Sequence, residues 1–124
     1  ELITDSERAM FMKTTGIECR HVALNGETTG DLCVHSAEIL LKSLQWSKDE
    51  IDLLIFVSQS PDYFLPATSI IAQDRLGLPK TTAAFDINLG CSGYVYGLSV
   101  ASSMMATGGF RKALLLVGDI STAP

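Results

Sequence analysis

Three apolar runs of strand length, separated by segments with helical periodicity, most strongly constrain the fold of this 124-residue chain. The runs are DLLIFVS (52–58), TAAFDIN (82–88) and KALLLVGD (112–119). A strand that is apolar along almost its whole length is covered on both faces, which is typical of a parallel sheet with helical crossovers. The sequence therefore predicts one α/β domain, or part of one, with right-handed connections.

Helical segments are expected before and between these strands. The predicted helices cover residues 6–14, 29–44, 66–76 and 91–107. We expect Ser6 to be the N-cap of the first helix, and we expect Pro66 in the first turn of the third helix, which ends at Gly77. Ser47 and Glu50 have the spacing of a capping box over a single turn.

Charge and cysteine content exclude several classes of partner and site. The formal net charge is -5 and the nine Lys and Arg residues are scattered, so we expect neither nucleic acid nor a membrane surface as a partner. The apolar runs are too short to span a bilayer. The three cysteines form no CxxC motif, and the two histidines are not at metal-ligand spacing from them. We expect no metal site, no disulfide framework and a cytoplasmic location.

The turn around Cys91 is the candidate functional site. It follows the strand at 82–88 and opens onto a helix, and in open α/β sheets reactive groups lie beyond the carboxyl ends of strands. Unpaired N–H groups and the helix dipole favour a thiolate there, and the Cys91 N–H is placed to face a developing oxyanion. We interpret Gly90 and Gly93 as residues that relax the turn. From the residues alone, an inert core cysteine is an equally good alternative.

The segment AFDINLGCSGYVYGLSVASSMMATGGFRKALLLVGD (84–119) resembles the active-site segment of β-ketoacyl-acyl-carrier-protein synthase III, in the thiolase superfamily. KTTGIECRHVA, IDLLIFVSQSPDYFLPAT and QDRLGLP resemble further parts of that family in the same order. The resemblance implies a three-layered thiolase-like α/β fold with a mostly parallel sheet and a buried active-site helix. It also implies a strand before Glu1 that lies centrally, between the strands at 53–58 and 112–118. We expect residues 1–124 to be part of the N-terminal thiolase-like domain of a longer chain.

The same resemblance implies an acyltransferase of fatty acid biosynthesis. Cys91 would accept an acyl group from a thioester, and malonyl-acyl-carrier protein would then lose carbon dioxide and attack the acyl-enzyme. The implied partners are the acyl-carrier protein and a second copy of the chain, and no cofactor is implied beyond the thioester substrate. The family pairs its cysteine with a histidine and an asparagine, which His21 and His35 do not match.

Three positions depart from the family's pattern. Thr14 and Met10 stand where bacterial members carry an arginine and a tryptophan that sandwich the coenzyme A adenine. Leu65 stands where many members carry a phenylalanine that lines the partner subunit's acyl pocket. We therefore expect weak binding of coenzyme A, or an acyl-carrier protein as the donor, and an acyl pocket of different shape.

Two alternatives stay open at this point. The altered clamp is compatible with an acyltransferase or thioester hydrolase of the same fold that works without decarboxylation. A non-catalytic partner subunit of a condensing pair is the other alternative, although the presence of Cys91 argues against it.

Overall fold

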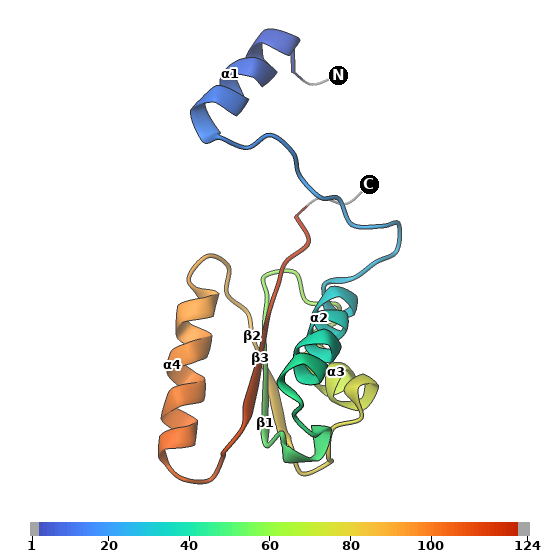
Figure 1. The fold of residues 1–124 in the computed structure, drawn as a ribbon, viewed down its shortest axis with the longest axis vertical. Coiled ribbons are helices and arrows are strands. Elements are labelled where there is room, and N and C mark those ends of the chain that lie inside the picture. The colour runs from blue at the N-terminus through green and yellow to red at the C-terminus, as the bar shows by residue number, and fades with distance from the viewer. Residues whose placement is uncertain (1–2, 122–124) are drawn as a thin grey trace.

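A three-stranded parallel sheet forms the centre of the computed structural model, which describes residues 3–121. Its strands, β1 (Leu53–Val57), β2 (Ala83–Ile87) and β3 (Ala113–Val117), lie in the order β2-β1-β3. The helices are α1 (Asp5–Thr15), α2 (Thr29–Leu44), α3 (Thr68–Leu76) and α4 (Gly93–Ala106), with the 3-10 turn η1 (Lys48–Glu50). The predicted parallel α/β sheet is confirmed (Figure 1).

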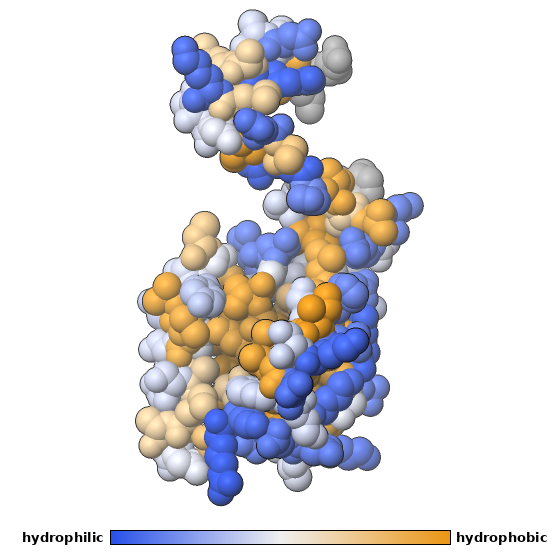
Figure 2. Space-filling view, in the orientation of Figure 1, coloured by the Kyte–Doolittle hydropathy of each residue, from blue (hydrophilic) through white to orange (hydrophobic). Residues whose placement is uncertain are grey.

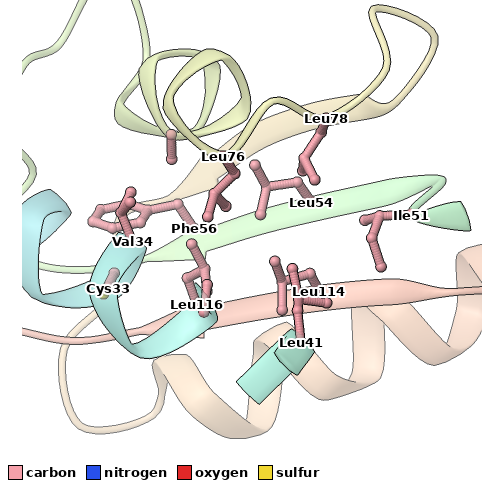
Figure 3. Packing of buried hydrophobic residues seen from close by; sticks show 12 residues of the cluster. Cys33, Val34, Leu41, Ile51, Leu54, Phe56, Leu76, Leu78, Leu114 and Leu116 are labelled. Carbon is pink, nitrogen blue, oxygen red and sulfur yellow. The ribbon is translucent and has the colours of Figure 1, made fainter. Parts of the chain in front are cut away.

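Helices cover both faces of this sheet. Figure 1 shows α2 and α3 on one side and α4 on the other, which gives three layers. Successive side chains of a strand point to opposite faces, so β1 contributes to two cores. Leu54 and Phe56 pack with α2 and α3 (Figure 3), whereas Leu53, Ile55 and Val57 pack towards α4. All five residues of β1 are buried, as its continuous apolar sequence predicts.

The order of the strands differs from the expectation in one respect. The resemblance implied a further strand between the segments at 53–58 and 112–118, but β1 and β3 pair directly, from Leu53 with Ala113 to Val57 with Val117. The N–H of Gly118 continues the ladder by donating to the Val57 carbonyl at 3.2 Å. An inserted strand would break these bonds, so the expectation of a missing central strand is wrong. The centre of the sheet is β1 itself.

Two predicted helix starts also need correction. The N-cap of α1 is Thr4 rather than Ser6, because the Thr4 hydroxyl accepts the Glu7 N–H at 3.3 Å and the Glu7 carboxylate accepts the Thr4 N–H. Pro66 lies before α3 rather than in its first turn, since the N-cap is Ala67. Gly77 ends α3 in the left-handed conformation, as predicted.

Helix α4 is covered on one side only within residues 3–121. Its buried residues, Gly93, Gly97 and Ala101, form a stripe of small residues against the sheet. Tyr94, Val95, Tyr96 and Leu98 are exposed on the rest of the helix. Figure 2 shows hydrophobic surface over α4 and the adjoining part of the sheet. Within the described residues, the helix that follows Cys91 therefore packs on the sheet with one face and exposes the other.

Helix α1 stands apart from the sheet and its covering helices. None of its residues is buried, and an irregular segment joins it to α2 (Figure 1). No helix within residues 3–121 has the length and apolar character needed to cross a membrane.

Candidate active site

Cys91 lies at the carboxyl edge of the sheet, as predicted, in the turn that joins β2 to α4. The turn is closed by a hydrogen bond of 2.8 Å from the Gly93 N–H to the Gly90 carbonyl. Helix α4 begins at Gly93 with Ser92 as its N-cap, so Cys91 immediately precedes the cap instead of opening the helix. Its side chain is exposed. The alternative of an inert core cysteine is therefore wrong in its premise that the thiol is buried.

The first turn of α4 lacks a side-chain cap, unlike the starts of its neighbours. Thr28 and Asp31 form a capping box at α2, and Asp86 accepts two N–H groups at the start of α3. The Ser92 side chain caps nothing, and within residues 3–121 the Cys91 N–H donates to no protein acceptor. Unsatisfied N–H groups at a helix start attract negative charge. The thiol thus lies beside donors that are free to meet an anionic oxygen.

The glycines of the turn are explained by packing, not by backbone freedom. Neither Gly90 nor Gly93 has a positive φ, so their expected role in relaxing the turn is wrong. A Cβ on Gly93 would lie 2.6 Å from Cγ1 of Val57, and one on Gly90 would lie 2.6 Å from Oε1 of Gln59. Both distances are far below van der Waals contact. Gln59 is exposed and its side chain can move, whereas Val57 is buried, so it is Gly93 that allows the turn to approach the end of β1 closely.

Carboxylates organise the other loops at this edge of the sheet. Asp119, after β3, accepts hydrogen bonds at 2.8 Å from both the Ser58 hydroxyl and the Gln59 N–H. Asp62 accepts the Gly30 N–H and the Thr28 hydroxyl, each at 2.8 Å. The side chain of Asp62 thus connects the loop after β1 to the start of α2. Its contacts within the chain are structural.

The two other cysteines differ from Cys91 and from each other. Cys33 is buried on α2, and burial, with the charges of Asp62 and Asp119, raises the pKa of its thiol to about 11. It borders an apolar groove of about 250 Å³ between α2 and β3. Cys19 is exposed in the irregular segment before α2. Residues 3–121 contain no cluster of three His, Cys, Asp or Glu side chains that could hold a metal ion.

Known proteins with a similar sequence are β-ketoacyl-ACP synthase III enzymes by name. Residues 85–123 match the family described as 3-oxoacyl-acyl-carrier-protein (ACP) synthase III. The chain is 39% identical over 118 residues to β-ketoacyl-ACP synthase III of Thiobacillus denitrificans, covering 95% of this chain and 37% of the relative. It is 42% identical over 116 residues to β-ketoacyl-ACP synthase III 2 of Streptomyces coelicolor, covering 94% and 34%.

A solved structure agrees with these relatives in fold. The 3-oxoacyl-ACP synthase of Burkholderia xenovorans LB400 superposes with a TM-score of 0.86 at 43% identity, over 90% of this chain and 32% of that one. Over nearly its whole length, the chain is similar to one part of these β-ketoacyl-ACP synthase III proteins. It spans about a third of the length of the relatives that it matches.

The residues at which the chain departs from the β-ketoacyl-ACP synthase III pattern lie in two places. Leu65 is 89% exposed, in the loop between β1 and α3, and that loop and the Cys91 turn both leave the carboxyl edge of the sheet. Met10 and Thr14 lie together on α1, where the Thr14 hydroxyl donates to the Met10 carbonyl at 2.8 Å. The structure thus brings Leu65 and Cys91 to one edge, and it places Met10 and Thr14 on a separate helix.

Asp86 is the site residue that sequence reasoning missed. Its Oδ2 and Oδ1 accept the N–H groups of Thr68 and Ser69 at 2.9 and 2.8 Å. The signal was present, since a lone carboxylate within the β-prone run TAAFDIN needs a partner on the face to which it points. The identity of that partner depends on how α3 crosses the sheet, which no local pattern specifies.

Proposed function

We propose that this chain supplies the acyl-accepting cysteine of a β-ketoacyl-ACP synthase III-type condensing enzyme, in fatty acid or related biosynthesis. The observation that carries the proposal is the exposed Cys91 thiol beside the uncapped start of α4. The similarity to β-ketoacyl-ACP synthase III proteins supports the same role. The three described cysteines are free, which supports a reducing, cytoplasmic compartment.

The geometry suits a two-step transfer. The Cys91 thiolate attacks the carbonyl carbon of an acyl thioester, and the N–H groups at the start of α4 stabilise the oxyanion that forms. Collapse of this intermediate expels the donor thiol and leaves an acyl-cysteine. A malonyl thioester on acyl-carrier protein then loses carbon dioxide. Its carbanion attacks the acyl carbon, and the new carbon–carbon bond releases the Cys91 thiolate.

Two partners follow from this proposal. The malonyl group arrives on an acyl-carrier protein, which therefore docks near the carboxyl edge of the sheet. A second copy of the chain pairs through β2 and brings its Leu65 loop towards the neighbouring Cys91. Coenzyme A is a weaker donor than the carrier protein, because Thr14 offers no guanidinium to stack on adenine.

Iodoacetamide labelling with peptide mapping tests the role of Cys91. We expect Cys91 to be alkylated first, Cys19 later and buried Cys33 last. Intact mass after exposure to an acyl thioester should show one acyl group, absent in Cys91→Ala and retained in the matched exposed-thiol control Cys19→Ala. Preferential labelling of Cys19 or Cys33 with Cys91 untouched, or an acylated Cys91→Ala protein, would contradict the assignment.

A further inference from the structure

Asp86 connects β2, the strand that precedes the Cys91 turn, to α3, the helix that follows the Leu65 loop. It lies on β2, and its two carboxylate oxygens accept the N–H groups of Thr68 and Ser69, the first two residues of α3. A carboxylate at this position pairs donors that the helix cannot satisfy itself and complements the helix dipole. The start of α3 is thereby held against β2.

The same helix start holds the loop. The Asp62 N–H donates to the Thr68 hydroxyl at 3.1 Å, while the Asp62 carboxylate binds the start of α2. The base of the loop is therefore fixed. Its apex is not covered, because Tyr63, Phe64 and Leu65 are all exposed. Three large side chains, two of them wholly apolar, thus project from an anchored base at the edge of the sheet that carries Cys91.

The contacts of Asp86 lie in a region where lost hydrogen bonds are hard to replace. Thr68 and Ser69 are both buried, and within residues 3–121 the buried Ser69 hydroxyl has no partner. Removing the carboxylate would leave two more donors unpaired beside it. Because buried unpaired donors are costly, the first turn of α3 would move to find new partners instead of staying in place.

We propose that Asp86 is a positioning residue that fixes the loop at 59–67 relative to Cys91, and thereby sets the acyl chain length that the site accepts. The inference rests on the proposed function, since it takes an acyl thioester as the substrate. In the proposed dimer the two copies pair through β2, and Cys91 lies just after β2 in each copy. Any shift of α3 and the loop away from Asp86 is therefore also a shift relative to the Cys91 thiol of the neighbouring copy. An acyl chain is apolar and extends from the reacting carbon, so the exposed apolar loop residues are suited to contact its far end.

The test compares acylation by thioesters of different length. Acetyl, butanoyl, octanoyl and dodecanoyl thioesters of N-acetylcysteamine are used, and the rate of acyl-Cys91 formation is followed by intact mass. Asp86→Asn keeps the side-chain size but removes the charge and one acceptor oxygen. A displacement of about 1 Å costs on the order of 100-fold in rate. We expect the ratio of long-chain to short-chain rates to change by about tenfold or more.

Asp52→Asn is the matched control. Asp52 also accepts two N–H groups, from Arg111 at 2.8 Å and Lys112 at 3.3 Å, but it lies at the amino edge of the sheet, remote from Cys91. Its chain-length profile should match that of the unmodified protein. Slow alkylation of buried Cys33 reports that each variant is folded. If Asp86→Asn exposes Cys33, Asp86→Glu replaces it, since that change keeps the charge but displaces the carboxylate from the Thr68 and Ser69 N–H groups by one methylene.

The outcomes separate the inference from the proposed function. If the folded Asp86→Asn variant, or Asp86→Glu where it replaces Asp86→Asn, has the same chain-length profile as the unmodified protein, the positioning role is overturned. An equal change in Asp52→Asn overturns it as well. Acylation that persists in Cys91→Ala overturns the proposed function, whatever Asp86 does. Three results together support the inference and the proposed function. The chain-length profile changes in the Asp86 variant but not in Asp52→Asn, acylation is lost in Cys91→Ala, and Cys33 stays slow to alkylate.

Discussion

The Cys33 thiol couples stability to pH. It is only 6% exposed, and burial, followed by the charges of Asp62 and Asp119, raises its pKa to about 11 from an ordinary value of 9.0. Between these two values the unfolded chain releases the thiol proton while the folded chain retains it. The free energy of unfolding should therefore fall as pH rises from 9 to 11, and the stabilising effect is fully present below pH 9.

Urea denaturation of the protein and of Cys33→Ala, across this pH range, checks the effect. Between pH 9 and pH 11, we expect the unmodified protein to lose about 2 to 3 kcal/mol of unfolding free energy more than Cys33→Ala does. Each pKa unit corresponds to about 1.4 kcal/mol. Cys33→Ala is the control for tyrosines and lysines that titrate over the same range. Parallel stability curves would show that Cys33 does not contribute in this way.

The close packing around Gly93 leads us to expect that one added methyl group there lowers the stability of the protein. A Cβ there would meet Cγ1 of Val57 at 2.6 Å and Cβ of Leu89 at 3.3 Å. Gly93→Ala must therefore push the start of the helix off β1, and we expect a loss of about 1 to 3 kcal/mol in thermal or urea unfolding. Gly109→Ala is the matched control, because its Cβ would find its nearest neighbour at 3.7 Å. Its stability should stay within about 0.5 kcal/mol.

At the scale of elements, the residues of α1 lead us to expect a low affinity for coenzyme A. Met10 is 66% exposed and Thr14 offers no positive charge, so the helix has no cationic surface for adenine at these positions. Calorimetry should detect weak binding, and Thr14→Arg should strengthen it by about 0.5 to 2 kcal/mol. Lys13→Arg, on the same turn, keeps the charge of the neighbouring position and should change little. Tight binding by the unmodified chain that survives substitution at Thr14 and Met10 would contradict this prediction.

Elements were predictable from sequence where the determining contacts are local. The helix at 29–44 and the capping box of Ser47 and Glu50 depend on residues a few positions apart, and both predictions are confirmed. The apolar run around Leu53–Val57 indicated a strand covered on both faces, which is also confirmed. Each of these signals is complete within one segment of the chain.

The remaining features depend on contacts between distant segments. The pairing of β1 with β3 is specified by how the chain returns to the sheet, and the implied extra strand had no local signal against it. Asp86 and Gly93 acquired their roles only when α3 and the end of β1 were placed beside them. The position of Cys91 beyond the carboxyl end of β2 could be predicted from the sequence, whereas the residues that hold its surroundings could not.

At the scale of the whole molecule, the position of β2 leads us to expect a dimer in which two copies pair through this strand. It is an edge strand in residues 3–121, and the Ala83 N–H donates inward to the Asp52 carbonyl at 2.9 Å. Because N–H groups alternate sides along a strand, the Ala84 N–H faces the outer edge, where an antiparallel copy could pair. Ala84→Pro removes this donor while leaving the bonds to β1.

Sedimentation tests the pairing. We expect the unmodified protein to sediment as a dimer at micromolar concentration, and Ala84→Pro to sediment as a folded monomer with lost activity. Ala84→Ser keeps the N–H and should remain dimeric. An active monomer of the unmodified protein at that concentration would refute the arrangement.

The central position of β1 has a consequence for amide hydrogen exchange. Its N–H groups are bonded to strands on both sides and its side chains are buried on both faces, so they exchange only when the whole sheet opens. Helix α1 buries no residue, and its amides can exchange by local fraying. In deuterated buffer we expect α1 to take up label within seconds to minutes while β1 stays protonated longest. A single time course would then measure the opening of the sheet and the fraying of α1 as two separate free energies.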